Sequence, residues 1–239
     1  MRKVQKFLLL LLAILPLSAL SQELTPTVSP TALYVDSTGV TQEVTKINDG
    51  EAPLEVTFRP NANNMGDHTP AYEWHFSKQG EEGEFLVRYE EETTYRFTES
   101  GTFNINLRVT LTDTGEQLDS ASITTLVVAI SESKLEFPNA FSPNGDEFNE
   151  IYQAKRGYKS IVEFHAYIFN RWGQKLYEWT DPAGGWDGTY KGSPVKEGVY
   201  FVLVKAKGAD GHVYNIRKDV NLLRGFTEVG NSTSSGEAP

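Results

Sequence analysis

The sequence of 239 residues contains no cysteine. This absence excludes disulfide bonds, thiol catalysis, cysteine-ligated zinc, iron–sulfur clusters and a lipid attached to an N-terminal cysteine. Basic residues are also few, with 22 Lys and Arg against 32 Asp and Glu and a net charge of −10. Because nucleic-acid affinity comes mostly from Lys and Arg contacts to phosphates, no nucleic acid is expected as a partner.

The motifs of common enzyme classes are missing as well. The chain has no GxSxG, P-loop or GxGxxG sequence. Its four histidines form neither HExxH nor an i, i+4 pair, which argues against zinc (His68, His75, His165 and His212). The glutamates between positions 81 and 92 are typical of a solvated face rather than of a catalytic carboxylate pair. We therefore expect a non-catalytic protein without a cofactor.

Long apolar runs are confined to the N-terminus. Arg2, Lys3 and Lys6 precede the apolar run Phe7 to Leu15, and Ala19-Leu20-Ser21 suits cleavage before Gln22. A membrane-spanning helix needs about 17–25 apolar residues, and this run is much shorter. We predict that residues 1–21 are a cleaved signal peptide, that the protein is exported and that no transmembrane segment remains after cleavage.

Helical periodicity is scarce, whereas alternation with a period of two residues recurs along the chain. The clearest case runs from Phe103 to Leu111, where five apolar residues alternate with four polar ones. Such alternation is typical of an antiparallel strand with one buried face. Similar short segments separated by turn residues predict a β-sandwich of the immunoglobulin type over residues 26–131.

A second domain is expected after a polar linker at residues 132–136. Residues 137–225 have denser aromatics and sharper turns, and residues 226–239 are rich in Gly, Ser and Thr, as in a flexible tail. Asp210-Gly211 predicts a β-hairpin with a type I′ turn, which requires positive φ at both positions. The predicted fold class is therefore all-β, with two tandem immunoglobulin-like β-sandwiches.

Three segments of the first domain resemble a PKD domain, a sandwich module of extracytoplasmic proteins. They are Ala52-Pro53-Leu54-Glu55-Val56-Thr57-Phe58, Tyr72-Glu73-Trp74-His75-Phe76 and the strand from Ser100 to Val109. The resemblance covers residues 51–130.

Residues 137–224 resemble the gliding motility-associated C-terminal domain, the type B sorting domain of type IX secretion. Five blocks in the expected order carry this resemblance: 137–146 (FPNAFSPNGD), 169–173 (FNRWG), 185–189 (GWDGT), 198–201 (GVYF) and 220–224 (VNLLR). Glu147 stands where the family usually has a further glycine. The resemblance implies a sandwich that directs a cargo across the outer membrane or belongs to a cell-surface protein, with an outer-membrane protein or the secretion machinery as partner.

These blocks supply the candidate docking and structural residues Asn170, Arg171, Trp172, Gly173, Trp186, Asp187 and Gly188. Both tryptophans adjoin a glycine, so packing of the ring over a tight turn is the favoured interpretation. Contact with a ligand or partner is the alternative. Arg171 is expected to form an ion pair or to lie over an aromatic face.

Four oxygen-bearing side chains lie within seven residues, at Asn144, Asp146, Asn149 and Glu150. Calcium is bound by six to eight such oxygens, but the spacing differs from that of an EF-hand. Capping of a turn by these side chains is the favoured interpretation, and a calcium site is the alternative.

Two tripeptides resemble O-glycosylation sites of proteins exported by bacteria with type IX secretion. They place candidate acceptors at Ser37 and Ser120. Together these observations predict an exported structural or docking protein of the cell surface or outer membrane. The alternatives are an adhesin module that binds a surface glycan or a protein, and a periplasmic subunit of an outer-membrane complex.

Overall fold

The computed structural model describes residues 25–118 and 123–225. The expected signal peptide, the expected tail and the candidate acceptor Ser120 lie outside these residues. The described residues contain strands, turns and loops but no helix, which confirms the all-β class. Within these two ranges no helix is long and apolar enough to cross a membrane.

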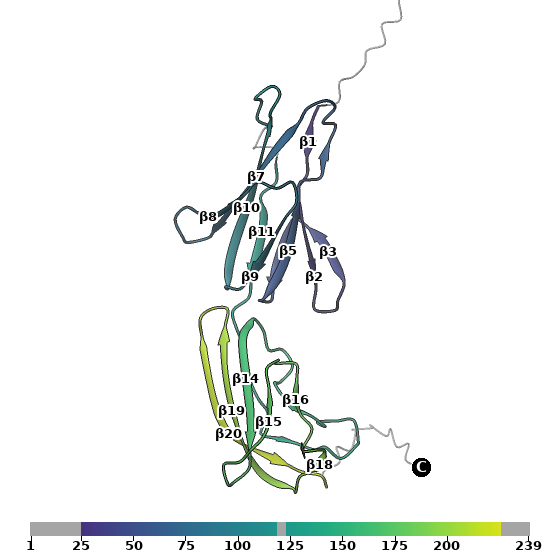
Figure 1. The fold of residues 1–239 in the computed structure, drawn as a ribbon, viewed down its shortest axis with the longest axis vertical. Helices are drawn as coiled ribbons and strands as arrows, with labels where there is room; N and C mark the ends of the chain where they lie inside the picture. The colour runs from purple at the N-terminus through teal and green to yellow at the C-terminus, as the bar shows by residue number, and fades with distance from the viewer. Residues whose placement is uncertain (1–24, 119–122, 226–239) are drawn as a thin grey trace, which may run out of the picture.

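The N-terminal domain is a sandwich of two sheets (Figure 1). The first has the strand order β4-β11-β10-β7-β8, with bounds Lys46–Gly50, Leu126–Ile130, Gly101–Leu111, Pro70–Lys78 and Glu84–Arg88. The second has the order β3-β2-β5-β9, with bounds Thr41–Val44, Thr31–Val35, Leu54–Arg59 and Thr93–Phe97. A short pair, β1 (Thr27–Val28) and β6 (Ala62–Asn63), extends the far end.

The predicted alternation matches the burial of β10. The five apolar residues from Phe103 to Leu111 are all buried, and β10 lies between β7 and β11 in antiparallel register. Leu107 is paired with Trp74, which is fully buried and contacts Phe58 from the opposite sheet at a ring distance of 6.0 Å. The apolar faces of the two sheets thus form one core.

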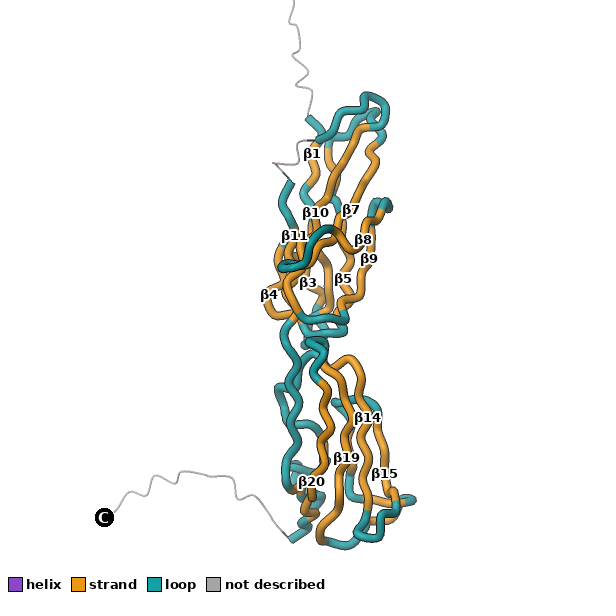
Figure 2. Tube along the Cα trace, turned by 90° about the vertical axis from the view of Figure 1, so that its left-hand side faces the viewer, coloured by secondary structure: helices purple, strands orange, loops and turns teal. Residues whose placement is uncertain are grey.

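The C-terminal domain has one long sheet with the order β12-β20-β19-β14-β15 (Figure 2). Its bounds are Ala140–Phe141, Val213–Leu222, Gly198–Gly208, Ile161–Phe169 and Lys175–Trp179. Loops and short strands cover its inner face: β13 (Tyr152–Gln153) with β16 (Gly185–Trp186), and β17 (Thr189–Tyr190) with β18 (Ser193–Pro194). Both domains fit the predicted immunoglobulin-like sandwich class, although the second layer here is mostly irregular.

The β19–β20 hairpin forms where Asp210-Gly211 predicted it, but the type I′ turn was wrong. Gly211 has φ +81°, whereas Asp210 is absent from the residues with positive φ. The amide of Gly208 donates to His212, and the amide of Gly211 donates to Gly208, which defines a three-residue loop ending in a left-handed glycine. The loop consists of residues 209–211, and the backbone of Ala209 is bonded to residues outside the hairpin.

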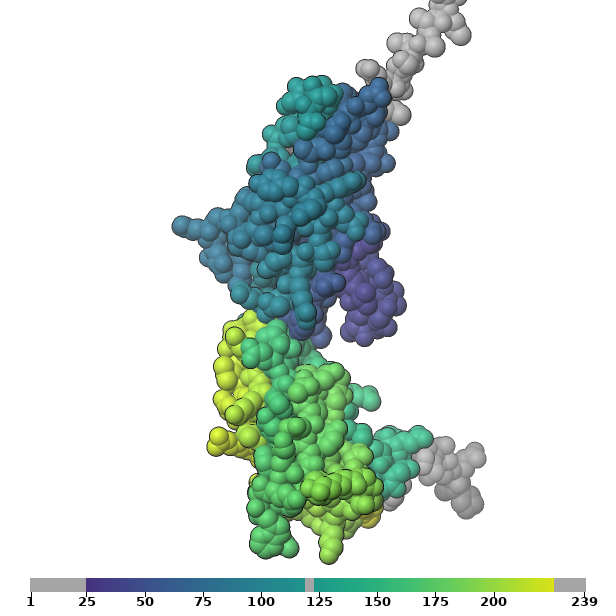
Figure 3. All heavy atoms as spheres, viewed as in Figure 1, coloured from purple at the N-terminus to yellow at the C-terminus, as the bar shows by residue number. Residues whose placement is uncertain are grey.

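These bonds of Ala209 belong to the junction between the domains. Its carbonyl accepts from the amide of Ser100 at 3.0 Å, and its side chain, 8% exposed, packs in the core of the N-terminal domain. The hydroxyl of Ser160 accepts from the amide of Ala52 at 3.2 Å, and Lys159 pairs with Asp49 at 3.2 Å. The domains therefore meet end to end through specific bonds, and the molecule narrows at this level (Figure 3).

We predict that Ala209→Asp loosens the junction, because a carboxylate would be forced into an apolar contact. Small-angle X-ray scattering should then show a larger spread of interdomain distances than in the wild type. Asn215→Asp, on the exposed part of β20, is the matched control and should leave the scattering profile unchanged. Identical profiles for all three proteins would contradict a bonded junction.

Candidate functional site

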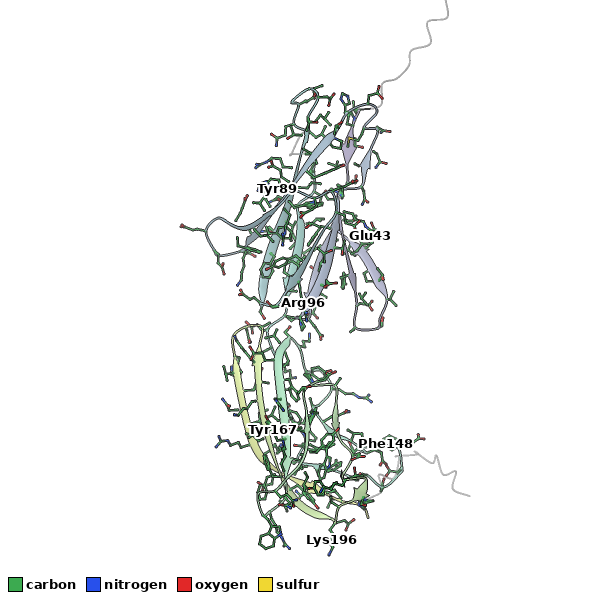
Figure 4. The ribbon with its side chains drawn as sticks, viewed as in Figure 1. Glu43, Tyr89, Arg96, Phe148, Tyr167 and Lys196 are labelled. Carbon is green, nitrogen blue, oxygen red and sulfur yellow. The ribbon has the colours of Figure 1, made fainter. Side chains whose placement is uncertain are left out.

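The motif residues gather in the half of the C-terminal domain that is farther from the junction (Figure 4). The β14–β15 turn, the end of β20 and the start of β19 lie there, because antiparallel β14, β19 and β20 reverse direction at both ends. The parallel pair of β12 with the end of β20 brings the first motif block alongside the last. We call this region the motif end and define it as the loops 142–151, 170–174, 187–197 and 223–225.

Arg224 ties the loops 142–151 and 187–197 to the segment 223–225. Its guanidinium donates to the carbonyls of Pro143 at 2.8 Å, Gly188 at 3.0 Å and Val195 at 3.2 Å. The carboxylate of Glu197 accepts from the backbone amide of Arg224 and from the next amide. A planar guanidinium has five N–H donors in a fixed geometry, so it can satisfy several carbonyls at once.

The oxygens of the loop 142–151 cap its own backbone. Asp146 accepts from the amide of Phe148 at 2.9 Å, Glu150 accepts from the amide of Gly145 at 2.7 Å, and Asn144 accepts from the amide of Asp146 at 3.1 Å. For Asn149 the backbone carbonyl is used, and it accepts from Ser142. The structure therefore brings the predicted residues together, in the arrangement of a capped turn.

Trp186, the last residue of β16, is the structural tryptophan beside the motif end. Its side chain is fully buried, its Nε1 donates to the carbonyl of Thr189 at 2.8 Å, and its ring lies 5.4 Å from Phe141 and 5.1 Å from Tyr200. Asp187 caps the following turn by accepting from the amide and hydroxyl of Thr189. Packing over a glycine-rich turn was thus the right interpretation for this tryptophan.

For Trp172 the packing interpretation is wrong. Its side chain is 80% exposed at the tip of the β14–β15 hairpin. The turn is held by Asn170, whose Oδ1 accepts from the amides of Trp172 and Gln174, and by Gly173 at φ +76°. These local bonds fix the backbone without the ring, which projects outward with the guanidinium carbon of Arg171 5.0 Å from its centroid.

A groove of about 540 Å³ begins beside Trp172. Its walls combine apolar side chains with charged ones, two of them basic and one acidic: Leu176, Tyr190, Val195, Val199 and Phe201 with Arg171, Lys196 and Glu197. Val199 and Phe201 are each more than two-fifths exposed on the open face of β19. Exposed apolar surface next to basic groups is typical of a surface that contacts another molecule.

The two domains differ strongly in charge. Residues 26–131 carry 6 Lys and Arg against 17 Asp and Glu, whereas residues 137–225 carry 12 against 10. The C-terminal domain is therefore close to neutral beside an acidic domain. An acidic partner that binds at the motif end is consequently repelled less than one that binds at the N-terminal domain.

The remaining candidate residues lie elsewhere. Ser37 is exposed in the β2–β3 turn next to Asp36, whose pKa is lowered to about 2, mainly by the hydrogen bond from Thr38 and then by that from Gln42. His75 lies on a sheet face between the carboxylates of Glu73 and Glu84. The described residues contain no cluster of three or more His, Asp or Glu side chains placed to hold a metal ion.

Sequence reasoning missed the role of Arg224 and of its partner Glu197. Arg224 was recognised only as the last residue of a motif block, since its carbonyl partners lie up to 81 positions away. No short-range spacing signals such a bond. The one available clue was that the block ends on a side chain with many donors.

The two interpretations of the loop 142–151 predict different responses to calcium. The carboxylate of Asp146 caps the turn by accepting from the amide of Phe148. We therefore expect Asp146→Ala to lower the melting temperature equally in calcium chloride and in EDTA. The wild type should melt at one temperature in both buffers. A melting temperature that calcium raises in the wild type but not in Asp146→Ala would show a cation site instead.

We predict that Arg224→Lys destabilises the protein by about 1.5–3 kcal/mol, the usual contribution of a hydrogen bond to a charged group. A single ammonium cannot span three carbonyls that a guanidinium reaches together. Urea unfolding should show a lower midpoint, whereas Arg217→Lys on the exposed part of β20 should leave it unchanged. Equal midpoints for both variants would contradict the role assigned to Arg224.

Comparisons with known proteins bear on fold and family. No curated protein sequence matches this chain. Among solved structures, the three N-terminal domains of the Highly Immunogenic Outer Capsid protein (Hoc) of bacteriophage RB49 match with a TM-score of 0.35 and 15% identity, over 83% of this chain and 59% of that one.

Two further structures are similar at the same low level. SGBP-B of the Bacteroides ovatus mixed-linkage glucan utilization locus, in complex with a mixed-linkage heptasaccharide, gives a TM-score of 0.25 and 15% identity, over 74% of this chain and 42% of that one. Dimeric latent PorU from Porphyromonas gingivalis gives a TM-score of 0.27 and 13% identity, over 85% of this chain and 20% of that one. The chain thus spans less than two thirds of each of the three structures.

The family comparison is specific to the second domain. Residues 135–218 match the model of the CHU_C type IX secretion signal domain, in agreement with the motif blocks. The resemblance of the first domain to a PKD domain stays a prediction. Residues 135–218 of this chain therefore match the CHU_C type IX secretion signal domain, which indicates an exported protein.

Proposed function

We propose that this protein is a non-catalytic structural or docking component of the cell surface or outer membrane. Its C-terminal domain contacts an outer-membrane protein or the secretion machinery through the motif end. The single observation that carries this proposal is the exposure of Trp172, a motif residue whose backbone is held by Asn170 without any help from the ring. A large apolar side chain that adds nothing to its own turn is available for a partner.

The position of the motif end supports this role. The N-terminal domain is bonded to the opposite end of the C-terminal sheet, through Ala209 and Ser160. A partner can therefore approach Trp172 and the neighbouring groove without displacing the first domain. The carboxylate of Glu197 in this groove accepts from backbone amides, and the two basic side chains, Arg171 and Lys196, favour a partner surface with acidic or carbonyl groups.

We expect Trp172→Ala to reduce the amount of protein at the cell surface or in the outer membrane, because the docking contact is lost. Its melting temperature should stay within about 2 °C of the wild type, since truncation of an exposed side chain changes stability little. The measurement is fractionation of cells into periplasm, outer membrane, surface and medium, with a thermal melt of each purified variant.

Two control variants separate docking from folding. Trp186→Ala should lower the melting temperature and remove the protein from all fractions, as expected for loss of a buried ring. Val213→Ala, an exposed apolar residue near the junction, should change neither stability nor distribution. Unchanged distribution of Trp172→Ala would overturn the docking role, and a wild type confined to the periplasm would favour a periplasmic subunit.

A further inference from the structure

Two adjoining hollows form a cleft at the junction between the domains. The inner hollow, of about 200 Å³, lies in the N-terminal domain and is walled by Phe85, Tyr95, Phe97 and Phe103. The outer hollow, of about 560 Å³, is lined by residues 98–100 on one side and by Val162, Glu163 and residues 207–211 on the other. Lys78, Thr98 and Glu99 line both hollows, so we treat them together as the junction cleft.

The inner hollow exists because the sandwich is open on this side. Strand β8 is the edge of one sheet and β9 the edge of the other, and no further strand of the described ranges closes the gap between them. Phe85 from β8 lies 5.8 Å from Tyr95 of β9 and 6.0 Å from Phe103, and it is 44% exposed. Phe97 and Phe103 are buried beneath them, so Phe85 and Tyr95 are the rings that a ligand can reach. Aromatic rings of this kind bind flat, weakly polar surfaces such as the C–H faces of a sugar ring.

Charged groups where the two hollows adjoin supply both hydrogen-bond donors and acceptors. The ammonium of Lys78 lies 2.9 Å from Glu99 and 3.1 Å from Glu81, and 5.7 Å from the centre of the Phe103 ring. Both glutamate side chains are more than half exposed, so their carboxylates have acceptor positions left beyond the lysine. Closely spaced donors and acceptors suit the neighbouring hydroxyl groups of a carbohydrate.

In the outer hollow, the second domain also supplies hydrogen-bond donors and acceptors. Glu163 and Lys207 face each other at 4.0 Å across neighbouring strands. Asp210 is held in place, since its carboxylate accepts from the amide and hydroxyl of Ser133 and from the amide of His212. The cleft thus extends from an aromatic pocket into a polar channel, as a chain of several sugar units would require.

The charge of the lining selects against anionic ligands. Two lysines stand against four carboxylates in the cleft, and the first domain as a whole is strongly acidic: Lys78 and Lys207, and Glu81, Glu99, Glu163 and Asp210. Phosphates, nucleic acids and uronic-acid polymers would be repelled. A neutral ligand with many hydroxyl groups meets no such barrier.

We propose that the junction cleft binds a neutral oligosaccharide chain, with one sugar ring against the exposed Phe85 and the half-buried Tyr95 and the following units between the domains. The bonded junction keeps both walls in place before binding, which lowers the entropic cost of association. Binding sites often lie at domain interfaces, and the outer hollow is within the usual range of about 300–1,000 Å³. This inference does not rest on docking through the motif end.

The test uses the exported chain, residues 22–239, in native gels that contain a soluble neutral polysaccharide: β-glucan, xylan, galactomannan or dextran. At least one should retard migration, and polygalacturonate, a polyanion, should not. Isothermal titration with an oligosaccharide of the retarding polymer then gives the dissociation constant. Lack of retardation in all four gels, or retardation only by polygalacturonate, would overturn the proposal.

Variants locate the site. Phe85→Ala and Glu99→Gln should each raise the dissociation constant at least tenfold, and Glu99→Gln, at an exposed side chain, should do so without a change in melting temperature. Tyr89→Ala is the matched control, because Tyr89 is an aromatic residue that is 70% exposed just beyond β8 and outside the cleft (Figure 4). Unchanged affinity in Glu99→Gln, or an equal loss in Tyr89→Ala, would contradict the assignment. Phe85→Ala should reach the same cell fraction as the wild type, which separates this outcome from the docking role.

Discussion

The guanidinium of Arg224 is the interaction on which the form of the motif end depends. It joins the carbonyls of Pro143, Gly188 and Val195, which come from the first motif block, the Trp-Asp-Gly turn and the loop before β19. The carbonyls of Gly188 and Val195 lie on either side of the β17–β18 pair, where the amide of Val195 also donates to Gly188. Because a half-buried charge that donates to several carbonyls is costly to leave unpaired, the loops 142–151 and 187–197 and the end of β20 become one unit.

Much of the fold could be predicted from local patterns. The alternation from Phe103 to Leu111 identified both the strand and its buried face, since side chains in a strand point to opposite sides in turn. The same reasoning identified the hairpin at Asp210-Gly211. It predicted a type I′ turn, whereas the loop has three residues and includes Ala209. The backbone of Ala209 is bonded to Ser100 and Ser160, and contacts with such distant residues leave no local pattern in the sequence.

Prediction of the candidate site was less complete, and for the same physical reason. Asn144, Asp146 and Glu150 were recognised as a group because capping bonds span only a few residues. Glu147, where the family resemblance implied glycine, adopts φ +72°, the conformation that a glycine would take without strain. Burial, however, depends on the whole fold, so sequence alone could not separate buried Trp186 from exposed Trp172.

The two ends of the C-terminal sheet show how one local structure serves two purposes. The turns at residues 209–211 and 171–173 have the same hydrogen-bond pattern, and each ends in a glycine with positive φ. At one end the small side chain of Ala209 allows the turn to enter the core of the first domain, whereas a larger one would not fit there. At the other end the equivalent turn carries Trp172, which no described residue buries. The turn at residues 209–211 thus packs against the first domain, whereas the turn at residues 171–173 presents an exposed apolar side chain. Such a sheet is suited to link the first domain to a separate partner.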